Sequence, residues 1–299
     1  MMIVISGSSG FIGQNLLKKI PNAKGVSLRD SKWRESFCSS EVIINLVGKA
    51  HDHDGKCTQK DYYYANVTLL KEQFNQFIQS ASKVFIHVSS IAAVEEYGRD
   101  ELLTETALCK PVSWYGKSKR EAEEWLLSQP LAVDKKLIIL RPPMIHGPGD
   151  KGNLGLLYKF ISKGIPYPLA AFNNRRSFIG IDNFAFFIES IIFKYQRMES
   201  GIYNISDNET LSTNEVIEVI EDVLCRNIIK VALPKNFLFF LARIGDMIPL
   251  PLNSKKLKKL TSNLIVSNAK IKQSLDIINL KDAAKGGLKK TLGSFRTDM

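Results

Sequence analysis

The sequence has few cysteines and no long apolar run. Its four cysteines, Cys38, Cys57, Cys109 and Cys225, lie far apart among 299 residues and form no CxxC pair. This spacing argues against a disulfide framework and a zinc site, and it predicts a protein of the reducing cytoplasm. No stretch approaches the ~18–20 uninterrupted apolar residues that a membrane-spanning helix requires. The apolar start of the chain runs directly into a glycine loop, which predicts a strand rather than a secretory leader.

Histidine is also scarce, and the only cluster that suggests a metal site is short. His51-Asp52-His53-Asp54 follows the third predicted strand, without a further ligand nearby in the sequence. Because zinc in proteins usually takes four ligands in a fixed geometry, we interpret this cluster as a solvated polar turn. We therefore expect no metal.

Acidic residues are outnumbered, with 30 against 41 lysines and arginines, which leaves a formal net charge of +11. Much of the excess lies in the last third of the chain, where no aromatic residues alternate with the lysines. A stacking platform for nucleic acid is therefore not predicted. We interpret the excess as a solvated basic face, with weak attraction to an anionic bilayer or a partner as the alternative.

An apolar segment at 237–252 precedes several of these lysines. We expect it to form a core or subunit-contact helix, which is the commoner explanation. Contact with a membrane surface is the alternative.

The first half of the chain alternates strand-like and helix-like stretches. The pattern predicts strands at 3–6, 25–28, 42–47, 83–89 and 136–141, and helices at 11–20, 62–80 and 114–127. This alternation indicates an α/β fold, a Rossmann-type doubly wound parallel sheet with helices on both faces.

Prolines and glycines interrupt the alternation after Pro142, and we expect a smaller C-terminal substrate-binding region there. Further helices are predicted at 154–163, 183–193 and 214–224, the last capped by Ser212 or Thr213 with Glu215 in its first turn. We place the dinucleotide-binding domain at 1–145, with returning segments at about 176–206, and the mainly substrate-binding region at 146–299.

Three glycines, Gly7, Gly10 and Gly13, follow the first predicted strand. In a dinucleotide-binding loop the first permits the tight turn, the second lets the backbone approach a diphosphate, and the third allows close helix–strand packing. The helix that begins near Phe11 would point its free amides at the phosphates. Such a trio also occurs in ordinary turns, but its place directly after the first strand favours a phosphate cradle.

The end of the second strand predicts NADP rather than NAD. An acid at this position binds the adenosine 2′-hydroxyl of NAD, whereas an arginine accommodates the 2′-phosphate of NADP. Arg29 occupies the position of the acid, and Asp30 follows one residue later. We therefore expect NADP, and NAD remains the alternative because Asp30 lies so close.

Ser90, Tyr115 and Lys119 form the predicted catalytic set. A tyrosine and a lysine four residues apart share one helix face, so the ammonium would lower the tyrosine pKa from its usual ~10. Tyr115 would then give or take a hydroxyl proton while a hydride moves at the same carbon. Ser90, after the fourth strand, would hydrogen-bond the same oxygen.

These residues resemble the extended short-chain dehydrogenase/reductase family, in its nucleotide-sugar epimerase, dehydratase and reductase branch. The resemblance spans roughly the first 210 residues and rests on segment 6–13, Asn45-Leu46-Val47-Gly48, Asn66, Val88-Ser89-Ser90, Tyr115 with Lys119, Arg141-Pro142-Pro143 and Arg176-Ser177-Phe178-Ile179. Ser6 stands where threonine is commoner in the family.

The resemblance implies a set of contacts with the cofactor and the substrate. The implied cofactor-binding residues are Gly7, Ser9, Gly10, Phe11, Ile12, Gly13, Arg29, Leu46, Val47, Gly48, Asn66, Ser89, Tyr115, Lys119, Pro142, Met144 and Ile145. Asn66 would also brace the sheet near the active site. The implied substrate-binding residues are Ser90, His146, Asn153, Arg175 and Arg176, the last three on the UDP part, because arginine suits a diphosphate. For His146 a hydrogen-bonded loop histidine is an equal alternative.

The resemblance also narrows the activity. Nucleotide-sugar dehydratases carry an Asp-Glu pair directly after the catalytic serine or threonine, whereas Ile91-Ala92-Ala93 follows Ser90, and Glu95 and Glu96 come too late. Arg29 and the stretch 141–153 favour NADPH-dependent reduction of the C4 ketone of a UDP-4-keto-6-deoxy-N-acetylhexosamine in bacterial surface-polysaccharide synthesis.

Two alternatives stay open beside the reductase. The first is a UDP-sugar C4 epimerase that retains NAD. The second is a non-catalytic NADP-binding sensor or structural subunit, although such proteins commonly lose the tyrosine or lysine that this chain keeps. The resemblance further implies a homodimer through a four-helix contact, which the helices at 62–80 and 114–127 would supply.

Overall fold

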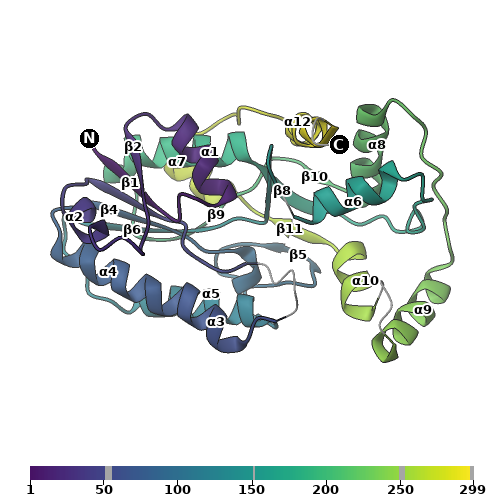
Figure 1. Cartoon of the computed structure of the whole chain (residues 1–299), viewed down its shortest axis with the longest axis horizontal. Coiled ribbons are helices and arrows are strands. Elements are labelled where there is room, and N and C mark those ends of the chain that lie inside the picture. The colour runs from purple at the N-terminus through teal and green to yellow at the C-terminus, as the bar shows by residue number, and fades with distance from the viewer. Residues whose placement is uncertain (51–55, 151, 249–252, 297–299) are drawn as a thin grey trace.

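A parallel sheet of six strands forms the centre of the computed structural model, which describes residues 1–50, 56–150, 152–248 and 253–296 (Figure 1). The strand order is β2-β1-β3-β4-β6-β9. Their bounds are β1 Ile3–Ser6, β2 Ala23–Val26, β3 Val42–Asn45, β4 Val84–Val88, β6 Lys136–Arg141 and β9 Gly201–Asn204. The predicted α/β, doubly wound parallel sheet is thereby confirmed. Because β2 and β3 lie on opposite sides of β1, the strand order reverses there, which is where such sheets bind their ligands.

Both faces of this sheet are buried, and the side chains of each strand alternate between two apolar cores. In β1, Ile3 and Ile5 face the core with helices α1 (Phe11–Lys19) and α7 (Ile181–Lys194), whereas Val4 faces the opposite core. The opposite core is covered by α2 (Trp33–Cys38), α4 (Leu69–Gln79) and α5 (Trp114–Leu127). Burial on both faces explains why β1, β3, β4 and β6 are almost continuously apolar in sequence.

The second strand lies two residues earlier than predicted. β2 pairs in parallel with β1 from Ile3 opposite Ala23 to Ser6 opposite Val26, so the two strands end together. Arg29 therefore lies in an exposed turn three residues beyond the strand, rather than at its end. Its backbone amide donates to Ser27 Oγ over 3.3 Å, which forms part of that turn.

The long helix predicted at 62–80 begins earlier and contains a π-helical turn. Helix α3 (Gln59–Tyr63) runs into a π-helical segment, η1 (Tyr64–Thr68), and then into α4. Thr58 caps the start, and its amide donates to Asp61 Oδ2 over 2.7 Å in a capping box. The π-turn carries the buried Asn66, in keeping with the frequent occurrence of such turns at functional sites.

A second sheet has the strand order β10-β8-β11-β5. Strand β7 pairs in parallel with the end of β8, from Met144 opposite Phe178 to His146 opposite Gly180. Its strands are β5 Arg99–Leu103, β7 Met144–His146, β8 Arg176–Gly180, β10 Thr210–Leu211 and β11 Leu264–Val266. The sequence did not predict these strands, because their pairings join segments that lie far apart in the chain.

Helices α6 (Asn153–Ser162), α8 (Thr213–Leu224) and α12 (Ala284–Arg296) pack into an apolar core beside this second sheet. The predicted start of α8 is confirmed, since Ser212 and Glu215 form a capping box. Three helices, α9 (Lys235–Met247), α10 (Ser254–Thr261) and α11 (Ala269–Ser274), complete the C-terminal part. Within the described ranges, no helix combines the length and the apolar character needed to cross a membrane.

Candidate active site

The loop after β1 is shaped by close backbone contacts. Gly7 has a φ of +75°, and a Cβ there would lie 2.8 Å from the backbone of Leu46 and Val47. A Cβ on Gly13 would lie 2.5 Å from Ser8 Cα, so the helix packs closely on the loop. Both positions therefore require glycine.

Gly10 leaves the outer side of this loop open. Its amide donates to the Gly7 carbonyl over 3.2 Å, and a Cβ there would meet only that carbonyl, at 3.5 Å. Gly10 precedes α1 without a side-chain cap, so the first amides of the helix are available to a ligand. Close backbone approach and free helix amides are what the diphosphate of a dinucleotide requires, so this loop fits the group that the sequence implies.

A buried polar network lies beneath the loop. Ser6 Oγ donates to Gln73 Oε1 over 2.5 Å, and Asn45 Oδ1 accepts the amide of Val47 over 2.9 Å. The other end of Asn45 lies 3.3 Å from Nδ1 of His87. Burial, assisted by the charge of Lys119, lowers the pKa of His87 well below its usual value. The network holds the turn after β3 against the glycine loop.

Tyr115 and Lys119 lie on one face of α5, next to Ser90 at the end of β4. The side chains of Ser90 and Tyr115 are hydrogen-bonded, and Ser90 Oγ also accepts the Ala92 amide over 3.2 Å at the start of a 3₁₀ turn, η2 (Ile91–Ala93). The Lys119 ammonium donates to the Val88 carbonyl over 2.9 Å. The predicted catalytic set is thus assembled at the carboxyl edge of the central sheet.

The electrostatics of Tyr115 differ from the prediction. Burial raises the pKa of Tyr115, the hydrogen bond from Ser90 lowers it, and the nearby charge of Glu96 raises it further. Burial also lowers the pKa of Lys119 to about 8, and its ammonium is engaged by the Val88 carbonyl. The expected lowering of the tyrosine pKa is therefore wrong, because desolvation of the phenol outweighs the favourable interactions.

Glu96 was missed by the sequence analysis as a residue of this site. Its carboxylate is buried and accepts the amides of Val112 and Ser113 over 2.9 and 2.6 Å, and the Ser113 hydroxyl over 2.6 Å. Ser113 in turn caps α5, so Glu96 fixes the start of the helix that carries Tyr115. Glu96 and Ser113 are 17 positions apart, so no local sequence pattern could predict the hydrogen bond between them.

A buried ion pair supports the other side of the catalytic residues. Arg141 donates from Nε and Nη2 to the two carboxylate oxygens of Glu123, over 2.8 and 2.6 Å. Ser89 Oγ donates to the same carboxylate over 2.6 Å. The hydroxyl of Ser89 therefore points at Glu123. If Ser89 contacts the cofactor, the contact would be made by its backbone carbonyl.

Asn66 joins the turn after β3 to α5. Its Oδ1 accepts the amide of Lys49 over 2.8 Å, and its Nδ2 donates to Ser118 Oγ over 2.8 Å. A Cβ on Gly48 would lie 2.8 Å from this Oδ1 and 3.2 Å from the Lys119 ammonium. Asn66 therefore lies where the resemblance implies, with hydrogen bonds that connect the end of the central sheet to the helix of Tyr115.

The remaining residues implied for the cofactor lie along the same edge of the sheet. Ser9 is exposed in the glycine loop, and Phe11, Ile12, Leu46 and Ile145 pack partly buried against the core. The buried Pro142 accepts the Ile91 amide on its carbonyl over 2.9 Å, which joins the end of β6 to the turn after Ser90. Met144 is partly exposed at the start of β7.

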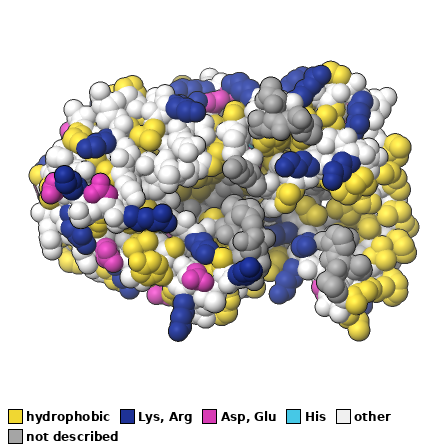
Figure 2. Space-filling view, in the orientation of Figure 1, with side chains coloured by type: hydrophobic (Ala, Val, Ile, Leu, Met, Phe, Trp, Pro, Cys, Tyr) yellow, Lys and Arg dark blue, Asp and Glu magenta, His cyan; other side chains and the backbone are white. Residues whose placement is uncertain are grey.

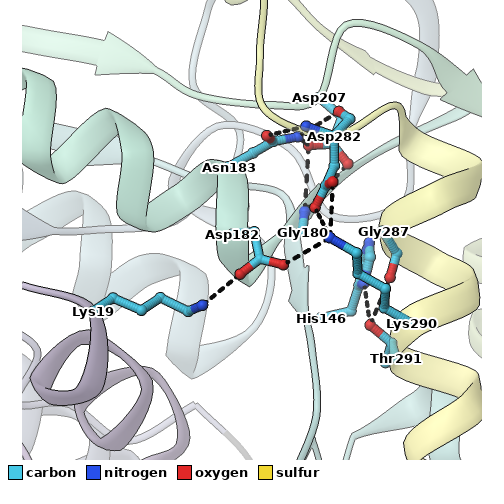
Figure 3. A network of polar contacts seen from close by, with 10 residues as sticks. All are labelled: Lys19, His146, Gly180, Asp182, Asn183, Asp207, Asp282, Gly287, Lys290 and Thr291. Carbon is cyan, nitrogen blue, oxygen red and sulfur yellow. Dashed lines mark hydrogen bonds and ion pairs between the residues drawn. The ribbon is translucent and has the colours of Figure 1, made fainter.

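His146 was expected to contact substrate, and the structure corrects this. Its ring is fully buried beside α12, and Nδ1 lies 2.9 Å from Thr291 Oγ1 (Figure 3). Thr291 donates to the Gly287 carbonyl over 3.1 Å, which makes Nδ1 the donor of the histidine. Burial lowers the pKa of His146 to about 4. The ring has no exposed surface for a ligand, so the alternative of a hydrogen-bonded structural histidine applies.

The residues expected to hold the UDP group lie on two elements. Arg176 is half-buried at the start of β8 and donates to the Ser262 carbonyl over 3.1 Å, and burial lowers its pKa to about 10. Arg175 is exposed, and its amide donates to Asn263 Oδ1 over 2.8 Å. Asn153 is exposed at the first residue of α6. The segment 262–263 is thus a support for both arginines that the sequence analysis did not identify.

A polar network connects the first helix with the last (Figure 3). Asp182 on α7 pairs with Lys19 of α1 over 2.5 Å and with Lys290 of α12 over 3.4 Å. Lys290 also pairs with Asp282 over 2.8 Å. Nearby, burial raises the pKa of Asp207 to about 6, although Asn183 donates to it over 2.7 Å. The cluster at 51–54, which we interpret as a solvated polar turn, lies outside the described residues. Within the described residues, no group of acids, histidines and cysteines has the arrangement of a metal site.

Comparison with known families gives one match that covers most of the chain. The model of the NAD dependent epimerase/dehydratase family matches residues 3–206. Among curated proteins, UDP-glucose 4-epimerase of Vibrio cholerae is 26% identical over 245 residues, which are 72% of this chain and 73% of the relative. N-acetyl-alpha-D-glucosaminyl-diphospho-ditrans,octacis-undecaprenol 4-epimerase of Escherichia coli O157:H7 is 26% identical over 258 residues, 78% of this chain and 75% of the relative.

Solved structures share the fold over the whole chain. UDP-glucuronic acid 4-epimerase from Bacillus cereus in complex with NAD superposes with a TM-score of 0.77 at 15% identity, over 99% of both chains. RMD from Pseudomonas aeruginosa complexed with NADPH superposes with a TM-score of 0.74 at 14% identity, over 100% of both chains. At these identities the likeness establishes the fold alone.

Proposed function

Because the chain belongs to the NAD dependent epimerase/dehydratase family, we propose that it is an NAD(P)-dependent enzyme acting at the C4 carbon of a UDP-sugar. The observation that carries this proposal is the assembly of Ser90, Tyr115 and Lys119 beside the glycine loop. Both curated relatives are named as 4-epimerases, which supports the choice of C4, and the name UDP-glucose 4-epimerase supports a UDP-sugar as the substrate.

Tyr115, Ser90 and Lys119 each have a separate role in the proposed reaction. The glycine loop would hold the dinucleotide, whose nicotinamide would supply or accept the hydride at the sugar carbon. Tyr115 gives its proton to the C4 oxygen when a ketone becomes an alcohol, and takes it back in the reverse direction. Ser90 donates a hydrogen bond to the same oxygen and so stabilises the charge that develops there. Lys119, whose ammonium donates to the Val88 carbonyl, would support Tyr115 and hold the cofactor ribose.

We favour NADPH-dependent reduction of the C4 ketone of a UDP-4-keto-6-deoxy-N-acetylhexosamine as the direction of this chemistry. Reduction requires a protonated Tyr115 as the proton donor, and a phenol with the ordinary pKa of about 10 or a raised one meets this requirement near neutral pH. The turn after Ser90 is occupied by Ile91-Ala92-Ala93, so the acid–base pair of a dehydratase is missing and the ketone would have to come from another enzyme. Arg29 does not lie at the end of β2, but its exposed side chain in the following turn offers a guanidinium for the 2′-phosphate of NADPH.

A C4 epimerase with retained NAD is the second candidate. It is favoured by the names of the curated relatives and by the neighbouring structure in complex with NAD. Asp30 follows Arg29 directly and offers a carboxylate for the adenosine ribose of NAD.

One experiment separates the two. Purified protein is mixed with NADPH and a UDP-4-keto-6-deoxy-N-acetylglucosamine pool that a dehydratase makes in situ, and absorbance of NADPH is followed. Stoichiometric loss of NADPH with the wild type and with the exposed control Tyr64→Phe, but not with Tyr115→Phe, supports the reductase. Interconversion of UDP-glucose and UDP-galactose without added cofactor, and no loss of NADPH, would establish the epimerase instead.

We also propose that the enzyme forms a homodimer through α5 and the helical stretch that ends in α4. Large side chains on these elements are exposed, including Tyr64 at 59%, Trp114 at 45% and Leu127 at 49%. Light scattering after gel filtration should report twice the chain mass of 33.6 kDa. A monomer at micromolar concentration would contradict this assembly.

A further inference from the structure

Helix α9 turns an apolar face away from the body of the protein. Leu238 and Ala242 are buried and attach the helix, whereas Phe237 is 48% exposed, Phe240 60% and Met247 88%. Counted from Phe237, apolar residues follow at three, four, seven and ten positions, and this spacing places all of them on one side of a helix. This set, Phe237, Phe240, Leu241, Ile244 and Met247, is called the α9 stripe.

Basic side chains accompany the α9 stripe. Helix α10 contacts α9, and its exposed lysines Lys255, Lys258 and Lys259 share one side because they are three and four positions apart, while Leu257 is buried. The segment 235–261 has six basic residues and one acid, a formal net charge of +5. Figure 2 shows hydrophobic side chains gathered at the end of the molecule where α9 lies, with lysines and arginines beside them.

We propose that the α9 stripe and the lysines of α10 together dock onto an anionic membrane surface. An apolar helix face flanked by positive charge is the pattern of a helix that lies in the interface, with its apolar side chains at headgroup depth. Lysines next to such a face are attracted to anionic lipids, and each contributes to binding near the surface. The docking is independent of the proposed reaction, since none of these residues belongs to the active site.

The charge of this surface argues against a second copy of the chain as its partner. A two-fold contact through the α9 stripe would bring the same patch of each copy together. Two segments with a formal net charge of +5 each would then face one another at short range, and each brings only one acid, Asp246, against its six basic residues. An anionic surface neutralises the lysines and covers the apolar side chains at the same time.

Vesicle flotation tests the proposal with the full chain. The protein is mixed with vesicles of phosphatidylcholine alone, or of phosphatidylcholine with about 30% phosphatidylglycerol, at low and at high salt. We expect flotation with the anionic vesicles at low salt and little with the neutral ones. Replacing Lys255, Lys258 and Lys259 by glutamate should weaken binding at least about 100-fold, since each basic residue contributes roughly fivefold.

A second variant tests the apolar part. Phe237→Gln, Phe240→Gln and Met247→Gln together should weaken binding about tenfold or more, because binding scales with the buried apolar area. The matched control replaces exposed apolar residues elsewhere in the chain by glutamine: Val133, Phe193 and Ile278, exposed by 100%, 76% and 82%. This control should bind like the wild type. The thermal unfolding midpoint of each variant is measured as well, to establish that the variant is folded.

Three results would overturn the proposal. The first is no flotation of the wild type with anionic vesicles. The second is flotation that both the α9 variant and the lysine variant leave unchanged. The third is association of two copies that the α9 variant abolishes, in the absence of vesicle binding, which would make the stripe a subunit contact.

Discussion

His146 is buried as a neutral imidazole, which predicts a loss of stability in mild acid. Its Nδ1 donates to Thr291 Oγ1, and its Nε2 has no hydrogen-bond partner among the described residues. Protonation would place a second N–H and a positive charge at this buried nitrogen. The pKa of His146 is therefore lowered from 6.5 to about 4.

The sign and the size of the effect follow from linkage. Below pH 6.5 the unfolded chain binds a proton at this position and the folded chain does not, so stability falls as the pH drops from 6.5 to about 4. One pKa unit corresponds to about 1.36 kcal/mol, so near pH 5 the loss from this residue is roughly 2 kcal/mol. The full loss is reached only below the folded pKa.

The assay compares the wild type with His146→Gln, which keeps an N–H donor but does not titrate. Urea unfolding, followed by circular dichroism at about pH 7.5 and pH 5, gives the free energy of unfolding of each protein. Wild type should lose about 2 kcal/mol more than the variant over this range. His87, whose pKa is also lowered, and Asp207, whose pKa is raised to about 6, titrate in both proteins and cancel in the comparison. Equal losses in the two proteins would refute the buried, neutral histidine.

Three further variants test the site and its supports. Gly7→Ala forces a side chain into a backbone with a φ of +75°, so NADPH affinity measured by fluorescence titration should fall at least about tenfold. Arg29→Asp should shift the ratio of kcat/KM for NADPH and NADH toward NADH, and an unchanged ratio would remove Arg29 from cofactor choice. Glu123→Gln leaves the charge of Arg141 buried without its carboxylate and should cost about 3–5 kcal/mol in urea unfolding, whereas the exposed Glu124→Gln should cost less than about 1 kcal/mol.

The central sheet was predictable because its signals are local. β1, β3, β4 and β6 are short apolar runs followed by a turn or a helix, and the glycine loop lies directly after β1, whereas β2 contains the exposed Lys24 and was predicted two residues too late. The helix with Tyr115 and Lys119 was predicted with its observed bounds, 114–127, because its apolar spacing lies within it. The order of these local signals along the chain was sufficient to place the catalytic set at one edge of the sheet.

The rest depends on contacts that no local pattern contains. β11 pairs with β5 and β8, so its existence depends on partners far along the chain. Glu96 acts on the cap of α5, and His146 is buried by α12. The pKa of Tyr115 also depends on such contacts. The four-residue spacing to Lys119 predicts an ammonium that lowers this pKa, but it does not contain the burial of the phenol, which raises it.

The most direct test of the proposed reaction follows the hydride itself. Wild type and Tyr115→Phe are given NADPH that carries deuterium at the transferring C4 position of the nicotinamide, together with the UDP-4-keto sugar, and the product is analysed by NMR. We predict one deuterium at C4 of the sugar for each NADPH consumed, and a rate in the variant at least about 100-fold lower. A product without deuterium, or a variant as fast as the wild type, would contradict a reduction at C4 in which Tyr115 is the proton donor.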